Sequence, residues 1–168
     1  MPIARTVQRF LDTHGLAYDV VPHPHTQTSY GSALTAHVPP ERVAKGVLLK
    51  GDEEYLLAVL PASRKLDLGW LKTELECDLQ LADEKDVADR FFDCASGAVP
   101  AVGPAYGLKT LVERCLRGQS DLYFEAGDHE ELVHVKEKDY ETLLGEVTYL
   151  SFTHLLDIPE PRARPIFD

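Results

Sequence analysis

The spacing of hydrophobic residues along the chain predicts short helices and strands in mixed order. Residues 3–13 place their apolar side chains at helical spacing, and Gly15 follows them as a C-terminal stop. Residues 17–21 are typical of a strand that ends at a proline. A second short helix is expected from Ser29 to His37, with Ser29 as its N-cap. The first forty residues therefore predict two helices with a strand between them.

Two apolar runs in the middle of the chain predict neighbouring strands. They cover residues 43–49 and 55–60, and the second is so continuously apolar that we expect it to be buried on both faces. The polar, glycine-containing segment 50–54 connects them as a hairpin turn. Further along, Asp67 and Asp83 each precede a helical pattern and are expected to cap a helix.

The second half of the chain predicts more strands and one more helix. The expected strands lie near residues 110–112, 122–124 and 132–135, and the helix covers residues 138–144. Before them, residues 96–107 hold too many glycines and prolines for a helix or a central strand. Helices mixed with hairpin-like strands favour an α/β fold of the α+β type around a mixed sheet. We expect one domain over residues 1–148 and an extended, proline-containing appendage over residues 149–168.

Composition narrows the class of protein. The chain has 168 residues, of which 44% are hydrophobic, enough for one domain with a proper core. Its net charge of −11 argues against a broad basic surface for DNA or RNA, but not against contact with the end of a nucleic acid. No apolar run is long enough to cross a bilayer, and no signal-peptide pattern is present. The expected location is the cytoplasm, without a membrane partner.

The motifs for metal binding and redox chemistry are missing. Cys77, Cys94 and Cys115 are widely spaced and form no CxxC pair. His23 and His25 form a His-x-His pair, but no third ligand follows at a suitable spacing. We therefore expect neither a cofactor nor a metal.

Lys45 is a candidate functional residue because it lies inside an apolar strand. A buried ammonium group must be paired or must face a pocket. Strand alternation puts Lys45 on the same face as Val43 and Val47. The alternative is a half-exposed lysine whose ammonium group reaches water.

Two later segments could also take part in a site. The glycines of segment 97–107 allow the backbone to approach a ligand, and its prolines fix the shape of the loop. A purely structural loop is the alternative.

His129 lies among acids after a strand and could act as a general base or orient a hydroxyl group. The alternative for His129 is a solvated histidine in a turn.

Taken in their order along the chain, these motifs resemble the YbaK/ProX family of aminoacyl-tRNA deacylases, which is related to the editing domain inserted in bacterial prolyl-tRNA synthetases. The resemblance covers residues 5–146. The segments that carry it are His23-Pro24, Ser29 to Ala36, Val43-Ala44-Lys45, Leu57 to Pro61, Lys65 to Leu68, Gly97 to Gly103 and Phe124 to His129. Their ordered set is more specific than any one of them.

The resemblance implies a barrel-like core wrapped by helices and an enzyme that deacylates mischarged tRNA in trans, with cysteine or alanine on tRNA-Pro as substrates. It implies that Lys45 faces the pocket for the tRNA 3′ end and that Gly97 and Gly103 belong to the loop that holds the ester. His129 would help to select the amino acid. The other residues expected to bind substrate are Tyr30, Ser96, Ala98, Val99, Pro100 and Ala101. Gly46 stands where many relatives have threonine, which leaves the shape of the pocket open.

Two other functions stay compatible with the residues. A binding or regulatory module would keep the pocket and lack turnover, and the acidic composition and Gly46 favour it. A metal-dependent hydrolase ranks last, because no ligand set is evident. The expected partners are the acceptor end of an aminoacyl-tRNA and a synthetase that could supply additional affinity for RNA.

Overall fold

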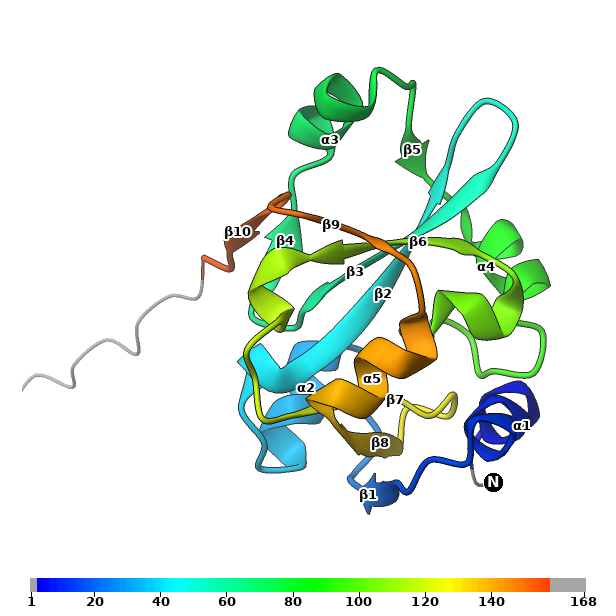
Figure 1. Ribbon diagram of the computed structural model, residues 1–168, viewed down its shortest axis with the longest axis vertical. Helices are drawn as coiled ribbons and strands as arrows, with labels where there is room; N and C mark the ends of the chain where they lie inside the picture. Colours follow the sequence, from blue (N-terminus) through cyan, green and yellow to red (C-terminus); the bar gives the residue numbers. More distant parts are fainter. Residues whose placement is uncertain (1–2, 158–168) are drawn as a thin grey trace, which may run out of the picture.

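One mixed sheet of eight strands forms the centre of the computed structural model, which describes residues 3–157 (Figure 1). Its strands are β1 (Asp19–Pro22), β2 (Val43–Lys50), β3 (Tyr55–Pro61), β5 (Gln80–Leu81), β6 (Lys109–Glu113), β7 (Asp121–Glu125), β8 (Glu131–Lys136) and β9 (Thr148–Leu150). They are ordered β1-β8-β7-β2-β3-β6-β9, and β5 pairs with β2 off this path. The pairs β2–β3, β7–β8 and β1–β8 are antiparallel, whereas β2–β7, β3–β6 and β6–β9 are parallel. The predicted mixed sheet and the predicted hairpin are confirmed.

The helices agree with the hydrophobic pattern. They are α1 (Arg5–His14), α2 (Ser29–Thr35), α3 (Leu68–Leu75), α4 (Glu84–Arg90) and α5 (Glu137–Leu144), with short 3-10 turns η1 (Pro40–Arg42), η2 (Gly103–Tyr106) and η3 (Arg114–Leu116). Gly15 ends α1 with a φ of +65°, in the left-handed region that suits glycine. Within residues 3–157, none of the helices is long and apolar enough to span a bilayer.

Side-chain caps fix where three helices begin. Asp67 accepts a hydrogen bond from the amide of Trp70 at 2.9 Å, and Asp83 accepts one from Asp86 at 2.8 Å. The prediction for α2 was wrong by one residue. Thr28 is the N-cap and accepts a hydrogen bond from the amide of Gly31 at 3.0 Å, whereas Ser29 is the first helical residue.

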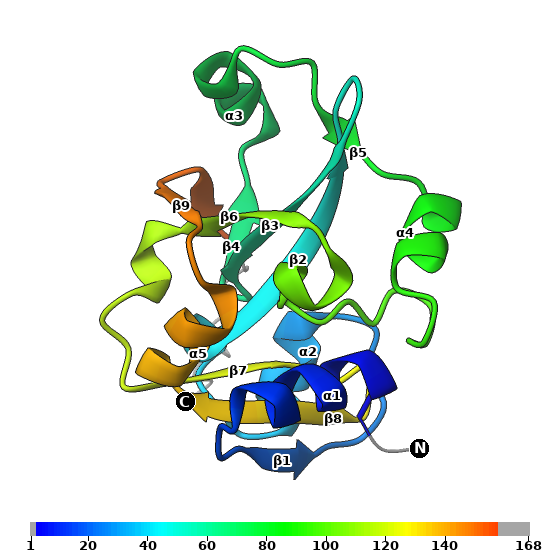
Figure 2. The same cartoon turned by 45° about the vertical axis from the view of Figure 1, so that its right-hand side comes forward.

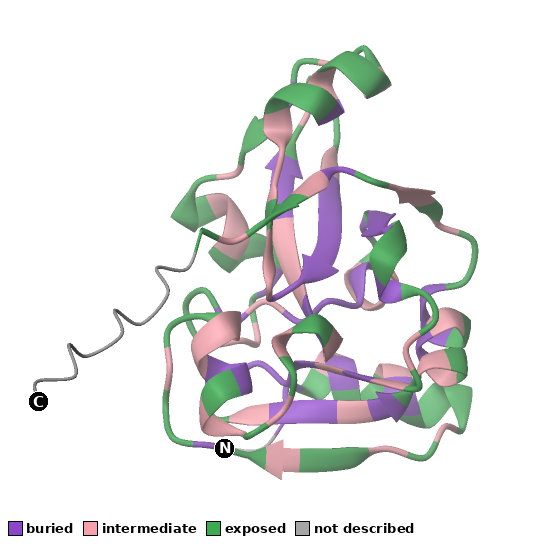
Figure 3. Cartoon of the chain, turned by 90° about the vertical axis from the view of Figure 1, so that its left-hand side faces the viewer, coloured by how far each residue is buried: buried purple, intermediate pink, exposed green. Residues whose placement is uncertain are grey.

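Helices cover both faces of the sheet. Val7 of α1 and Tyr140 of α5 are buried in one core cluster, on the face that α1 and α5 cover (Figure 2). Ala33 of α2 packs with Val43 in a separate cluster on the other face. The central strands of the sheet are largely buried, whereas the edge strand β1 is largely exposed (Figure 3). β3 is buried on both faces from Leu56 onward, as predicted.

The edge of β2 that faces β7 has an opening. On its other edge β2 pairs with β3 along nearly its whole length. On this edge β7 pairs only with Val43 and Ala44, and β5 only with Leu49 and Lys50. Among residues 3–157, no strand pairs with residues 45–48 on this side. Loops can therefore approach the middle of β2 from this edge.

The segment after α5 is folded further than the sequence suggested. β9 pairs with β6, and β10 (Thr153–Leu155) pairs with β4 (Arg64–Leu66). Phe152 between them is 1% exposed, and its amide donates a hydrogen bond to the Glu113 carboxylate at 2.8 Å. The expectation of an extended appendage is thereby corrected for residues 149–155. Residues 158–168 lie outside the described part, and the domain boundary at residue 148 stays a prediction.

Candidate active site

The turn after β7 is held by one carboxylate oxygen. Oε1 of Glu125 accepts hydrogen bonds from the amides of Gly127 at 2.9 Å, Asp128 at 3.1 Å and His129 at 3.1 Å. His129 has a φ of +64°, a left-handed conformation that is uncommon for residues other than glycine. The three charge-assisted hydrogen bonds stabilise this conformation and so fix the direction of the histidine side chain.

The ring of His129 is buried rather than solvated, which removes the alternative of a solvated turn histidine. The residue is 6% exposed, and its Nε2 lies 2.6 Å from the carbonyl oxygen of Ser96. A carbonyl oxygen can only accept, so Nε2 carries the hydrogen and donates it. In the neutral ring, Nδ1 is left with a lone pair that can accept a proton or a hydrogen bond. The ring of His25 packs edge-on against it, with the ring centroids 5.3 Å apart.

The glycine-containing loop lies against this turn. The amide of Ala95 donates to the carbonyl oxygen of Gly127 at 2.8 Å, and Gly97 faces the His129 ring. Gly97 has a φ of +77°, so a side chain there would strain the backbone. The amides of Ala98 and Val99 donate within the loop, whereas the Gly97 amide donates to no group in the described part of the chain.

The loop reaches the opening in β2 at Gly46. A Cβ atom built on Gly46 would lie 3.0 Å from Cγ1 of Val99 and 3.1 Å from Cδ1 of Leu57, which is tighter than ordinary contact. Gly46 therefore allows the loop to lie directly on the strand.

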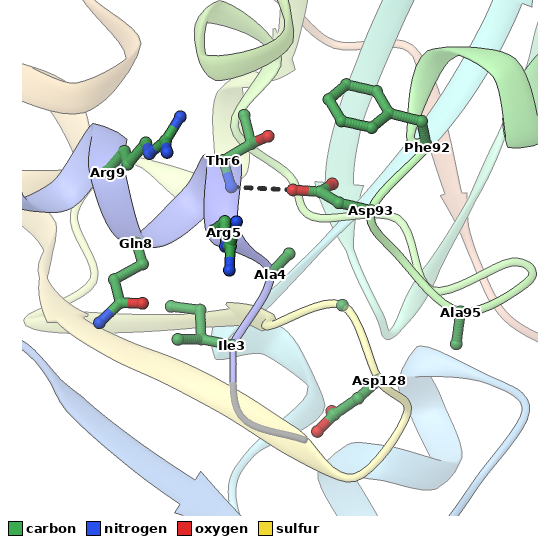
Figure 4. A pocket seen from close by; sticks show the side chains of 11 residues that line it. Ile3, Ala4, Arg5, Thr6, Gln8, Arg9, Phe92, Asp93, Ala95 and Asp128 are labelled. Carbon is green, nitrogen blue, oxygen red and sulfur yellow. Dashed lines mark hydrogen bonds between the residues drawn. The ribbon is translucent and has the colours of Figure 1, made fainter.

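Three neighbouring hollows surround the loop. A cavity of about 40 Å³, which we call the inner cavity, is lined by Gln27, Thr28, Ser29, Gly46, Gly97, Val99, Glu125 and His129. A groove of about 530 Å³ runs between α4 and the loop and shares Gln27, Gly97 and Val99 with the inner cavity. A hollow of about 920 Å³ lies beside the start of α1 and shares Phe92 and Ala95 with the groove (Figure 4).

A family model described as the aminoacyl-tRNA editing domain matches residues 23–143, which is more than half of the chain. The chain belongs to this family. The matched residues include every residue that lines the inner cavity. The comparison with curated proteins gives no match.

Solved structures have the same fold as this editing domain. The crystal structure of a proposed trans-editing enzyme for prolyl-tRNA synthetase is 24% identical, with a TM-score of 0.78 over 92% of this chain and 98% of the other. A scaffold protein used for computational grafting of epitopes is also 24% identical, with a TM-score of 0.79 over 93% and 99%. A hypothetical protein is 18% identical, with a TM-score of 0.77 over 89% and 100%. The fold class implied by the resemblance is confirmed.

The editing domain brings together only part of the site predicted from sequence. Gly97, Val99 and His129 meet around the inner cavity, and Ser96 and Ala98 line the groove beside it. The other predicted loop residues, Pro100, Ala101 and Gly103, are buried and line none of the three hollows. A side chain at Gly103 would collide with Thr110, which gives this glycine a packing role. Tyr30 is half-buried in α2 and lines none of the three hollows.

Lys45 lies at the opening in β2, but its side chain leaves the sheet on the face opposite to the loop. It pairs with Leu60, whereas Gly46 pairs with Val59 and faces Val99. The side chain is partly buried, and desolvation lowers the pKa of its ammonium group below the ordinary value of 10.5. Within residues 3–157 this ammonium group has no ion pair or hydrogen bond. It does not line the inner cavity.

Sequence reasoning missed several residues that line the inner cavity, above all Glu125. The others are Gln27, Thr28 and Ser29, whereas Gly46 was already linked to the shape of the pocket. One signal was available, because Glu125 directly follows the apolar strand residues Tyr123 and Phe124. A carboxylate at the end of a buried strand requires partners, and that requirement points to the turn it holds.

Proposed function

We propose that this editing domain is a deacylase that acts in trans on mischarged aminoacyl-tRNA, hydrolysing the ester between the amino acid and the terminal adenosine. The observation that carries the proposal is the inner cavity, a small polar space where the Gly97 loop, the Glu125 turn and the start of α2 converge on Gly46. The likeness to a proposed trans-editing enzyme for prolyl-tRNA synthetase supports it. Such an enzyme would work in the cytoplasm, where aminoacyl-tRNA is used.

The volume of the inner cavity suits a small amino acid. A volume of about 40 Å³ holds about three water molecules, by the rule that one water needs roughly 10–15 Å³ of such space. Among aminoacyl groups, small ones such as alanyl, seryl and cysteinyl suit a space of this size best. Cysteine or alanine on tRNA-Pro therefore remain the proposed substrates. A second sieve of this kind is needed because a synthetase pocket rejects a slightly smaller amino acid by only about 1–3 kcal/mol.

The residues around the cavity divide the work of ester hydrolysis. A water molecule attacks the ester carbonyl carbon and passes a proton to Nδ1 of His129, whose tautomer is fixed by the Ser96 carbonyl group. The Gly97 amide, which has no partner within residues 3–157, donates to the developing oxyanion. The ribose oxygen then leaves with a proton returned from His129. The sequence predicted that the whole loop holds the ester, and the proposal now gives the stabilisation of the oxyanion to the Gly97 amide alone.

Lys45 would act from the other face of β2. Its partly buried ammonium group has no counterion within the described part of the chain, and a phosphate or hydroxyl group of the terminal nucleotide would complete its contacts. We assign it a binding role, because it lies away from the inner cavity.

The hollow beside α1 offers a path for the unpaired nucleotides that precede the terminal adenosine. Arg5 and Arg9 line it opposite two acids, Asp93 and Asp128 (Figure 4). Phe92, at 73% exposure, lines both this hollow and the groove. An exposed aromatic ring with nearby cations is the usual platform for single-stranded RNA. Two arginines would give the local and weak contact that suits a chain with a net charge of −11.

The test is a panel of tRNA-Pro charged with alanine, cysteine, serine or proline, incubated with the purified protein and with its Lys45→Ala variant. We expect hydrolysis of at least one of the small amino acids, no hydrolysis of Pro-tRNA-Pro, and loss of activity in the variant. Tight binding of these tRNAs without any hydrolysis would instead identify a binding module. Loss of hydrolysis with a chelator would identify a metal-dependent hydrolase.

A further inference from the structure

Glu125 is a buried carboxylate with only one of its two oxygens in use. The residue is 8% exposed and lines the inner cavity. Oε1 accepts three backbone hydrogen bonds, whereas Oε2 accepts none from any group in residues 3–157. Oε2 is not enclosed by protein atoms, so it is open to the inner cavity, where a ligand can reach it.

The cavity around Glu125 contains no side chain that could neutralise it permanently. Its other lining residues are Gln27, Thr28, Ser29, Gly46, Gly97, Val99 and His129, among which there is no lysine or arginine. Nε2 of His129 is already directed at the Ser96 carbonyl group. The space beside Oε2 of Glu125 therefore suits a small cation that carries N–H donors.

We propose that Oε2 of Glu125 binds the α-ammonium group of the aminoacyl ester. The inference rests on the proposed function, since every aminoacyl-tRNA carries this group whatever its side chain. A single carbon atom separates the α-nitrogen from the ester carbonyl. An ammonium group held at Glu125 therefore places that carbonyl beside Gly97 and His129, which line the same cavity.

This contact makes the free amine a condition of turnover. A charge-assisted hydrogen bond between ammonium and carboxylate is among the stronger ones in proteins. An acylated amine has lost its charge and is bulkier than the small cavity admits. Glu125 would thus protect peptidyl-tRNA and formylated aminoacyl-tRNA from hydrolysis.

Glu125→Gln separates this role from the structural one. The amide oxygen of glutamine can keep the three hydrogen bonds of the turn, while an NH₂ group replaces Oε2. Glu130→Gln is the matched control, because Glu130 lies in the same turn, is exposed and lines none of the three hollows. Thermal unfolding of both variants shows whether the turn is intact.

The experiment measures the binding of 3′-alanylamino-3′-deoxyadenosine, whose amide link cannot be cleaved as an ester, and of its N-acetylated form. We expect the wild type and Glu130→Gln to bind the free amine about tenfold or more tightly than the acetylated form, by analogy with hydrogen bonds to charged groups. Glu125→Gln should bind both alike. Equal binding of the two compounds by the wild type, a preference retained by Glu125→Gln, or no binding at all would overturn the inference.

Failure of the inference and failure of the proposed function give different results. If none of the mischarged tRNAs is hydrolysed while the amine preference persists, the proposed hydrolysis fails and the ammonium site stands. If alanyl-tRNA and N-acetyl-alanyl-tRNA are hydrolysed at equal rates, the hydrolysis stands and the role of Glu125 fails.

Discussion

Val99 occupies the space that a side chain on Gly46 would need, since a Cβ atom at Gly46 would lie 3.0 Å from its Cγ1. The two residues come from a strand and from a loop more than fifty positions away. Both line the inner cavity, so together they set its size on the side of β2. Gly46, the departure from many relatives noted in the sequence, is thus matched by a branched residue in the loop.

Gly46→Thr should therefore be destabilising, and Val99→Ala should relieve part of the effect. Gly46 does not have a positive φ, so lack of space is the obstacle to threonine. We expect a loss of about 1–3 kcal/mol from overpacking in the single variant. The double variant should lose less than the sum of the two single losses, because the shortened Val99 leaves room. Urea unfolding of the four proteins measures the coupling, and strictly additive losses would show that the two residues do not compete for space.

Lys45 should show a conflict between stability and activity. Burial lowers the pKa of its ammonium group, so the folded state disfavours the charged form. Above the unfolded value of about 10.5 this cost is absent, and it appears as the pH falls from that value toward the lowered pKa. Below the lowered pKa the cost is fully present. Lys45→Met, which keeps the length and removes the charge, should unfold at higher temperature than the wild type at pH 7, and this advantage should shrink above pH 10.

The same variant should raise KM for deacylation by about tenfold or more, the scale of losing one hydrogen bond to a charged group. Lys50→Met is the control, since Lys50 is exposed at the end of the same strand. Normal deacylation by Lys45→Met would exclude the proposed contact with the terminal nucleotide.

Local signals predicted most elements of the fold. Asp67 and Asp83 cap their helices through bonds to the third residue along, and Gly15 stops α1, so each boundary depends on a few neighbours in sequence. The prediction of an extended appendage was wrong because the fold of this segment depends on residues far away in the sequence. Phe152 looks like part of a proline-rich tail, but its amide bonds to Glu113, thirty-nine residues earlier.

The candidate site was harder to predict, because it assembles where β2 loses its strand partners. Alternation put Lys45 on the face of Val43 and Val47, but it does not tell that the Gly97 loop covers the other face, at Gly46. Glu125 depends on the turn it holds and on a cavity formed by three distant segments. The contacts between these distant segments are decided by tertiary packing, and a local sequence pattern holds no information about them.

Cys94 should be chemically inert although it lines the groove beside the candidate active site. Its sulfur lies 3.4 Å from the hydroxyl oxygen of Tyr106, and burial raises its pKa to about 12. At pH 8 only about one molecule in ten thousand would carry a thiolate, which is the reactive form. Iodoacetamide at pH 8 should therefore leave Cys94 unmodified in the native protein and modify it in urea, as read by mass spectrometry. Cys94→Ser should keep its deacylation rate, and a large loss would instead point to covalent catalysis.

The path for the tRNA end can be separated from the chemistry of the ester. Arg9→Glu and Phe92→Ala change the hollow beside α1 without touching the inner cavity (Figure 4). Both variants should raise KM for mischarged tRNA, and Phe92→Ala should do so by about fivefold, the lower end of the effect of losing one stacked base. Hydrolysis of a minimal substrate, 3′-alanyl-adenosine, should be unchanged, because it lacks the preceding nucleotides.

For Arg9→Glu the dependence of KM on salt should also become shallower, since a phosphate contact is lost. Lys72→Glu on α3 serves as the control for net charge, because Lys72 lines none of the three hollows. An equal loss on both substrates would place these residues in support of the fold instead of along the RNA.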